Sequence, residues 1–412
     1  MDCLKGLMFF YKYQKPGNLE FNMLRRGETY FASVAELNDA NECRPRFILK
    51  GSEELWQRLA QFVLERVCFG TEYYREKNLE EIRQILDLSQ SVGRQLKKRA
   101  RNRDVGIENL GESFVDVLGP SLEEKVPRLQ SRLITRLARD FIDGELLGIL
   151  KNEKYMASFS KNATNPTMWG HYAGAEKGFV IVYGTDDGTI HVKSPLDVLH
   201  GTRPLNEDGS CAEIGIYKNE RLKLSEVAYG RRPPKVNAFH RLIHKFSYTE
   251  EEDHYDVPLQ LGGDAQNKEE SIIGLVKYSD WRYEQEVRAF FPTFGALTSD
   301  IRALSVSIDN IRGLILGPRM SCADKVRAVL CCHLMRESLD ARASQAEKAV
   351  NNFVFFRARQ VVDRFGFEIL PVGILEGSYF DDHLPLKPLH DLEKPIADKL
   401  HEMAEIITAR RT

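Results

Sequence analysis

The chain has 412 residues, of which 42% are hydrophobic, so it can bury one large core or two moderate cores without a disulfide or a metal. Its 58 basic and 60 acidic residues give a net charge of −2, which excludes a general electrostatic attraction to nucleic acid or anionic lipid. Seven cysteines without a CxxC pair, and no run near the roughly 18 apolar residues of a membrane helix, predict a cytoplasmic protein with reduced thiols, no metal site and no membrane segment.

The beginning of the chain predicts short strands and turns. Leu7–Tyr13 is apolar and aromatic, Pro16-Gly17 marks a turn, and Thr29–Ala32 is a second β-prone run before the Asn38-Asp39 turn. We therefore expect residues 1–50 to contribute strands to the main sheet.

Residues 51–151 change to a helical pattern. Apolar side chains recur at helical spacing within Leu55–Val67 and Leu79–Leu86, which predicts two amphipathic helices. A further helix is expected to begin near a capping box at Ser121 and to continue to about Leu150. This part of the chain is therefore predicted to be a helical insertion.

Strand-forming sequence returns after the insertion. The predicted strands are Tyr155–Ser160, Gly178–Tyr183, Glu286–Phe291 and Arg312–Leu316. The second of them, a run of valine, isoleucine and aromatic residues, is typical of a buried strand. The end of the chain, from His390 to Thr412, has the pattern of one amphipathic helix.

These elements predict an α+β fold with a mixed, largely antiparallel sheet as its core. Residues 1–50 and 152–375 would form the core domain, residues 51–151 a helical insertion, and residues 376–412 a C-terminal helical tail. The sequence leaves the oligomeric state and the partner of the insertion open.

Hydroxyl, indole, imidazole and phenol groups gather within fifteen residues after the insertion. They belong to Ser158, Ser160, Trp169, His171 and Tyr172. Such groups are costly to bury without a partner. Aromatic faces could sandwich a planar base or a nicotinamide, and a strand-edge serine could hydrogen bond to a carboxamide or a ribose. Taken alone, the cluster is also explained by a polar turn that a half-buried histidine and tyrosine hold in place.

A second candidate segment is rich in charge. Glu284, Glu286 and Arg288 would lie on one side of a strand, because side chains alternate with a period of two. Two close carboxylates raise the pKa of at least one of them unless a cation is near, and Arg288 or Arg282 could keep both ionised. An ionised carboxylate can bind a ribose hydroxyl, stabilise an oxocarbenium-like centre or act as a base. An exposed strand face with alternating charges would show the same pattern.

Six short motifs are spread over about residues 7–320. They are Tyr11-Lys12-Tyr13, Asn38-Asp39, Phe159-Ser160, Met168-Trp169-Gly170-His171-Tyr172-Ala173, Lys177-Gly178-Phe179 and Trp281-Arg282-Tyr283-Glu284-Gln285-Glu286-Val287-Arg288. Their residues and order resemble the bacterial domain-of-unknown-function family DUF2971. That resemblance supplies no activity.

A looser likeness is to the mono-ADP-ribosyltransferases. These enzymes order an Arg or His on a first strand, a Ser-x-Ser or a Tyr on a middle strand, and a Glu, often as Glu-x-Glu, on a late strand. This chain offers Lys12 or Tyr13, then Ser158-Phe159-Ser160, then Glu284-Gln285-Glu286, so that a lysine stands where an Arg or His is expected. The likeness implies NAD as the substrate.

The same likeness implies roles for individual residues. Glu286 would hold the hydroxyl of the nicotinamide ribose and stabilise positive charge as nicotinamide leaves, while Glu284 or His171 would orient the acceptor nucleophile. Serine hydroxyls would hold the ribose and aromatic rings would stack on nicotinamide. The substrate-binding candidates are Lys12, Tyr13, Ser158, Ser160, Trp169, Tyr172 and Arg288.

We therefore expect an NAD-using transferase with a protein or nucleic-acid acceptor, of the kind found among bacterial toxins and phage-defence effectors. A non-catalytic sensor that binds a nucleotide-like ligand in the same pocket, with the insertion engaging a partner protein, is the alternative. A metal-dependent nuclease is less favoured, because Lys277 is expected to lie too far along the strand from Glu284 to form the usual acid-x-Lys unit.

Overall fold

The chain divides into a core unit and a helical unit. The computed structural model describes residues 7–39, 41–69, 79–100, 105–150, 154–195, 217–246, 269, 271–291, 297–340, 353–375 and 385–409. The core unit comprises residues 1–42, 153–231 and 277–412, and the helical unit comprises residues 43–152 and 232–276. The predicted α+β class is confirmed.

This division differs from the predicted domains in three places. Residues 43–50, predicted for the core domain, belong to the helical unit, and their strand lies in a separate three-stranded sheet. Residues 232–276 group with the helical unit, because β11 (Lys235–Asn237) pairs there with β4 (Arg46–Leu49) and α11 (Ala238–Phe246) contributes to the helical core. The last helix, α14 (Lys394–Ala409), belongs to the core unit rather than to a separate tail. Its apolar side chains, such as Met403, are buried against residues of the sheet.

The core unit is built on a 13-stranded mixed sheet, in which β15 and β16 are parallel and the other recorded pairs are antiparallel. From one edge to the other the order is β18 (Leu386–Pro388), β17 (Phe367–Leu375), β16 (Val354–Gln360), β15 (Ile311–Leu316), β7 (Phe179–Thr185), β1 (Met8–Gln14), β6 (Tyr155–Ser160), β13 (Glu286–Phe291), β9 (Tyr217–Glu226), β8 (Thr189–Pro195), β14 (Ala303–Val306) and β2 (Glu28–Tyr30), and β3 (Ala32–Ser33) also pairs with β6.

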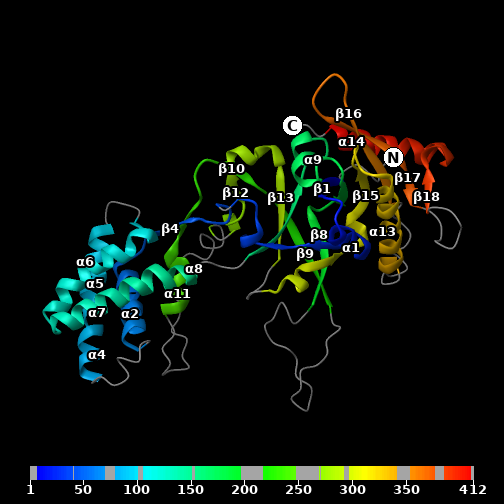
Figure 1. Cartoon of the computed structure of the whole chain (residues 1–412). Helices are drawn as coiled ribbons and strands as arrows, with labels where there is room; N and C mark the ends of the chain where they lie inside the picture. The colour runs from blue at the N-terminus through cyan, green and yellow to red at the C-terminus, as the bar shows by residue number, and fades with distance from the viewer. Residues whose placement is uncertain are drawn as a thin grey trace, which may run out of the picture. The chain divides into compact units, whose positions relative to one another are not determined.

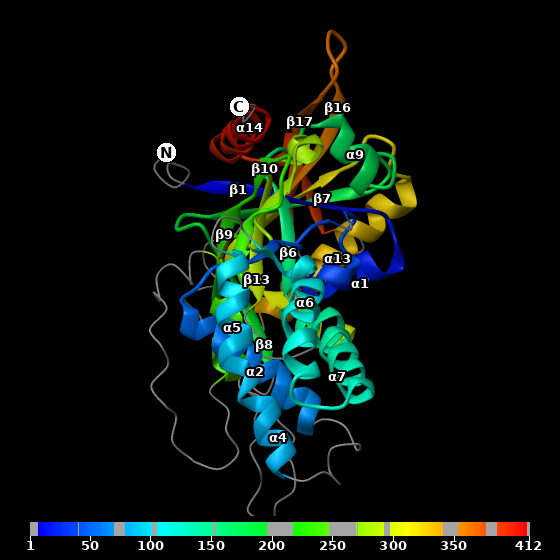
Figure 2. The same cartoon turned by 90° about the vertical axis from the view of Figure 1, so that its left-hand side faces the viewer.

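Both faces of this sheet are covered. Along β7, Phe179 and Ile181 point into one apolar cluster, and Val180 and Val182 into the other, as the period-two alternation requires. The first cluster includes side chains of α1 (Asn18–Arg26) and α13 (Cys322–Asp340), which lie side by side (Figure 2), and the second includes side chains of α9 (Pro166–Tyr172) and α14. Because both faces are covered there, β7 is buried at every position, as its apolar sequence predicts.

The two edges of β1 are paired unequally. On one edge, β1 pairs with β7 at every position from Met8 to Gln14. On the other edge, it pairs with β6 at one position, Tyr11 opposite Ser160, and the neighbouring stretch of β6 pairs instead with β3 at Met156 and Tyr155. The ladder is therefore open along β6 between these two contacts.

The helical unit has its own buried apolar core. Its elements are β4, α2 (Glu53–Phe69), α4 (Leu79–Leu86), α5 (Leu88–Arg99), β5 (Val105–Gly106), η4 (Ile107–Asn109), α6 (Leu110–Glu123), α7 (Arg128–Phe141), the π-turn Ile142–Leu146, α8 (Leu147–Leu150), β11 and α11 (Figure 1). The expected helix start at Ser121 is wrong, because that hydroxyl donates to the carbonyl oxygen of Val117 inside α6. The chain instead breaks before α7, where Pro127 is the N-cap.

Within the described parts of the chain, no helix combines the length and the apolar character that crossing a membrane requires.

Candidate active site

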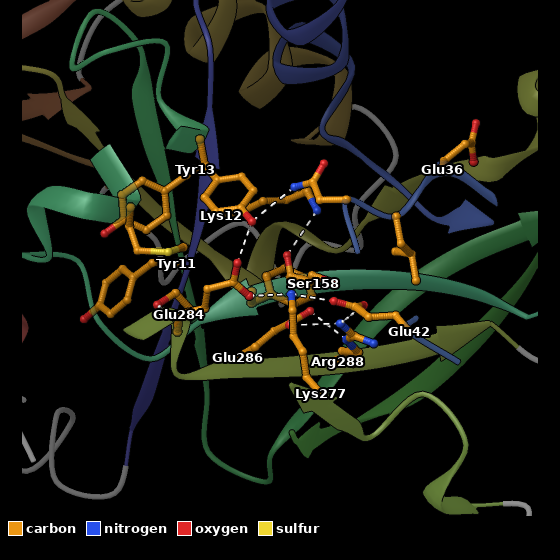
Figure 3. Close-up of a pocket in the computed structure, with 16 residues that line it drawn as sticks. Tyr11, Lys12, Tyr13, Glu36, Glu42, Ser158, Lys277, Glu284, Glu286 and Arg288 are labelled. Atoms are coloured by element: carbon orange, nitrogen blue, oxygen red, sulfur yellow. Dashed lines mark hydrogen bonds and ion pairs between the residues drawn. The ribbon is translucent and has the colours of Figure 1, made fainter. Parts of the chain in front are cut away.

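A pocket lies at the opening between β1 and β6 (Figure 3). Its cavity of about 170 Å³ is smaller than the ~300–1,000 Å³ typical of ligand sites. The lining residues are Tyr11, Lys12, Tyr13, Glu36, Leu37, Asn38, Glu42, Ser158, Phe159, Ser160, Met168, Tyr172, Lys277, Glu284, Glu286 and Arg288. The space suits one end of a larger ligand or one small molecule.

Lys12 reaches across the opening from β1. Its Nζ donates to the carbonyl oxygen of Ser158, 3.3 Å away, which is a β6 acceptor that the interrupted ladder leaves available. The ammonium also lies 5.1 Å from the centre of the Phe159 ring. Among the described residues no carboxylate forms an ion pair with Lys12, and burial lowers its pKa to about 8 despite the opposing effect of Glu286. The positive charge of Lys12 is therefore available to bind an anionic group of a ligand.

The other two cations of the pocket are fully compensated. Lys277 Nζ lies 2.7 Å from Glu42, and Arg288 Nη2 lies 2.6 Å from the second oxygen of the same carboxylate. Glu286 closes the ring, with Arg288 Nε at 2.6 Å and Lys277 Nζ at 3.2 Å. Two cations and two carboxylates thus alternate in a buried ring, in which every charge touches two opposite charges.

Lys277 reaches this ring because the chain turns back on itself. Lys277 lies on β12 (Val276–Tyr278), which is followed by the 3₁₀ helix η6 (Ser279–Glu284). Gln285 then adopts a left-handed conformation with φ of 44°, and β13 begins at Glu286. Lys277 Nζ consequently lies 2.6 Å from Glu284, so the expected separation of these two residues is wrong. The expectation of one continuous strand is also wrong: Glu286 and Arg288 share a strand face, and Glu284 ends the 3₁₀ helix.

Glu284 stands outside the ring and meets different partners. One of its oxygens contacts Lys277, and the other accepts a hydrogen bond of 2.5 Å from the hydroxyl of Tyr172. Asn38 donates to that hydroxyl in turn, over 3.1 Å. The Ser160 hydroxyl donates to the backbone oxygen of Glu284 over 2.6 Å, which fixes the end of the 3₁₀ helix against β6.

The pKa values of Glu284 and Glu286 are shifted in opposite directions. Burial alone would raise the pKa of Glu286, but Arg288, Lys277 and a hydrogen bond from the Ser158 side chain outweigh it and hold this pKa at about 2. Burial raises the pKa of Glu284, and the charge of Glu286 adds to that effect, although Lys277 and Tyr172 oppose it. Burial would lower the pKa of Lys277, but the three glutamates raise it above its ordinary value. Such a pair, with one fixed anion and one carboxyl that can hold a proton, suits acid–base chemistry.

Comparison with known proteins gives one match. Residues 168–289 match the model of a family described as Protein of unknown function (DUF2971). The predicted resemblance to DUF2971 is confirmed. No curated protein and no solved structure matches the chain. The matched DUF2971 segment contains Tyr172, Lys277 and the Glu284–Arg288 run, whereas Lys12 and Ser158 lie before it.

Most of the predicted site residues line this one pocket. They are Lys12, Tyr13, Ser158, Ser160, Tyr172, Glu284, Glu286 and Arg288. The hydroxyl of Tyr13 donates to the carbonyl oxygen of Asn162 over 2.8 Å, so its ring stays at the wall of the pocket. The three segments that the sequence singles out therefore do meet in space.

Trp169 and His171 do not line the pocket. Trp169 is fully buried in the second apolar cluster, where its indole N–H donates to the carbonyl oxygen of Ala163 and its ring packs edge-on against Tyr13. It has no free face for nicotinamide, so its predicted stacking role is wrong. His171 is exposed, and its Nδ1 lies 3.1 Å from the hydroxyl of Tyr283, so it is poorly placed to act on a ligand in the pocket.

Glu42 and Lys277 are the members of the buried charge ring that sequence reasoning missed. Glu42 lies in a loop beyond the predicted Asn38-Asp39 turn, where nothing in the sequence distinguishes it from a solvated acid. Lys277 lies before the Glu284–Arg288 segment that the sequence singles out. Its contact with Glu286 depends on the turn through Gln285, which the sequence does not predict. In the described parts of the chain, no three His, Cys, Asp or Glu side chains are grouped so as to hold a metal ion.

Proposed function

We propose that the protein is an ADP-ribosyltransferase-like enzyme that uses NAD as its substrate. The observation that carries this proposal is the adjacency of β1, β6 and β13, which brings Lys12, Ser158 and Glu286 to one pocket in the chain order that such enzymes use. Neighbouring strands, rather than distant loops, position the three groups, which favours a rigid and pre-organised site.

The ionised carboxylate of Glu286 supplies the electrostatic part of the reaction. As the bond between ribose C1′ and the nicotinamide nitrogen breaks, the bonding pair leaves with nicotinamide and positive charge develops on the ribose. A buried carboxylate held ionised by Arg288 stabilises that charge. A carboxylate has about four acceptor sites, and Arg288, Lys277 and Ser158 already occupy those of Glu286. A ribose hydroxyl would therefore take the place of the Ser158 side chain.

The other pocket residues bind the substrate and complete the transfer. Lys12 offers its uncompensated ammonium to a phosphate of NAD, and the rings of Tyr13 and Tyr172 contact nicotinamide. Glu284 accepts the proton of the acceptor nucleophile as the nucleophile bonds to C1′, in preference to the exposed His171. The cavity holds the nicotinamide end only, so the adenosine end would lie outside it.

NAD consumption by the purified protein tests this proposal. Wild type is expected to release nicotinamide in the presence of a lysate that supplies acceptors, and Glu286→Gln should reduce the rate by about 10²–10³-fold. Glu226→Gln is the matched control, because Glu226 lies on the adjacent strand β9 with an exposed side chain paired to Lys161. Wild type that neither binds nor consumes NAD would overturn the assignment.

A nucleotide sensor without catalysis is the second candidate. It is favoured by the saturation of Glu286, whose oxygens are already engaged by Arg288, Lys277 and Ser158. In that case NAD or a related nucleotide binds and is returned intact, which the same experiment detects as binding without nicotinamide release.

An NAD-consuming toxin or phage-defence effector would instead deplete cellular NAD on expression, and Glu286→Gln would abolish the depletion.

A further inference from the structure

Lys277 has a coordination that no other cation of the pocket shares. Its ammonium contacts Glu42, Glu284 and Glu286, at 2.7, 2.6 and 3.2 Å. A lysine ammonium carries three N–H donors and no acceptor, so each donor has one carboxylate to meet. The side chain is only 5% exposed, which leaves little room for water to replace it.

The charge balance of the pocket depends on this contact. The ring of Lys277, Glu42, Arg288 and Glu286 is neutral, and Glu284 adds one negative charge, whose only ion pair among the described residues is with Lys277. Without Lys277, three buried carboxylates would share the single guanidinium of Arg288. Buried carboxylates without a cation take up protons rather than remain ionised.

We propose that Lys277, with Glu42 as its counter-ion, is a positioning residue that assigns the two neighbouring glutamates their separate tasks. Lys277 keeps Glu286 ionised within the ring, and it holds Glu284 outside the ring, where Tyr172 shares its second oxygen. Glu42 anchors Lys277 and Arg288 together from the opposite side. The kinetic consequence rests on the proposed function, but the effect on ionisation does not.

The groups that face these carboxyls are few and known. Glu284 faces Lys277, Tyr172 and Glu286, while the phenols of Tyr229 and Tyr283 lie within electrostatic reach. Glu286 faces Lys277, Arg288 and Ser158, Lys12 lies within electrostatic reach of it, and its backbone N–H donates to the Tyr229 hydroxyl. The indole of Trp281 covers Lys277, with Nζ 5.0 Å from the ring centre. No histidine is among these groups in the described structure, so carboxyl titration below neutral pH reports on the glutamates.

Carboxyl titration by NMR of protein with ¹³C-labelled glutamate tests the proposal directly. Glu284→Gln and Glu286→Gln each remove one signal and so assign the pair. Lys277→Met removes the ammonium at similar length, Lys277→Arg keeps the charge in a planar fork, and Lys161→Met is the control, because Lys161 pairs with Glu226 outside the pocket. Should Lys277→Met fail to fold, the charge-balanced Lys277→Met/Glu42→Gln variant takes its place.

We expect Lys277→Met to raise the pKa of Glu286 from about 2 toward 4.5 and to raise that of Glu284 further, while Lys277→Arg and Lys161→Met leave both near wild type. Where NAD is consumed, the acid limb of the kcat profile should move to higher pH with Lys277→Met, and Lys277→Arg should lower kcat more than it changes KM. Glutamate signals that titrate in Lys277→Met as in wild type would overturn the proposal. Failure of wild type to cleave NAD would overturn the proposed function instead and leave the titration result standing.

Discussion

Along its edge toward β7, β1 is paired at every position from Met8 to Gln14, whereas along its edge toward β6 it is paired at one. The closed edge is lined by apolar residues that are buried on both faces of the sheet, such as Phe179 and Val180. The open edge is lined by lysine, glutamate, serine and tyrosine. One strand can therefore stabilise the fold along one edge and present a site along the other.

The largest effect is expected on the closed edge. Phe179 is fully buried and packs against Phe21, with ring centroids 5.4 Å apart. Phe179→Ala should lower the free energy of unfolding by about 3–5 kcal/mol, because it leaves a cavity in a packed core. Ser158→Ala, on the half-buried open edge, should cost about 1 kcal/mol or less while reducing NAD turnover. Denaturant unfolding of both variants measures the contrast, and equal losses would contradict it.

The buried ring of Lys277, Glu42, Arg288 and Glu286 should make the free energy of unfolding depend on pH in the acid range. The pKa of Glu286 is about 2 in the folded protein, below its ordinary value of 4.5, so folding is favoured above 4.5 and this stabilisation is lost as the pH falls toward 2. The loss should amount to about 3 kcal/mol. Glu286→Gln should lack this component, which unfolding measured between pH 5 and 2 would show. Glu226→Gln should behave as wild type, and an unchanged slope in Glu286→Gln would argue against the ring.

The smallest effect concerns Lys12. Its lowered pKa of about 8 means that the folded protein binds this proton less tightly than the unfolded chain does. Stability should therefore rise as the pH increases above 8. Lys12→Met should stabilise the protein at pH 7 by a net of about 1 kcal/mol, because relief of the burial penalty is partly offset by loss of the hydrogen bond to Ser158 and the contact with Phe159. The same variant should bind NAD more weakly, because the ammonium that would pair with a phosphate of NAD is lost. A variant that is both less stable and fully active would contradict this view of the open edge.

The sheet could be predicted further than the site. Strands such as β1 and β7 follow from local apolar and aromatic runs, because a buried strand imposes that composition along its length. The helix α1 was missed, because Asn18–Arg26 follows a Pro-Gly turn and lies between two strand-like runs. Its left-handed C-cap at Gly27 is a helix-end signal that the sequence does contain.

Some site residues could be placed from local sequence patterns, whereas others depend on turns and packing that appear only in the folded chain. Ser158 and Glu286 lie on regular strands, so their alternation is readable from the sequence. Lys277 reaches Glu284 through a 3₁₀ helix, and Glu286 returns to Lys277 only after the left-handed Gln285. No periodic pattern in the sequence predicts this turn. Trp169 resembles a stacking residue in sequence, and only the packing of α9 on the sheet shows that it is core.

The position of Glu42 and Lys277 in the chain bears on how this protein can be re-engineered. Glu42 is the last residue of the core unit before the chain enters the helical unit, and Lys277 is the first residue after the chain leaves it for the last time. Their side chains form an ion pair of 2.7 Å inside the pocket. Exchanging the helical unit would need four junctions, because residues 153–231 of the core unit lie between its two segments. The first and the last of these junctions would adjoin charges of the site, so an exchanged unit must retain this pair.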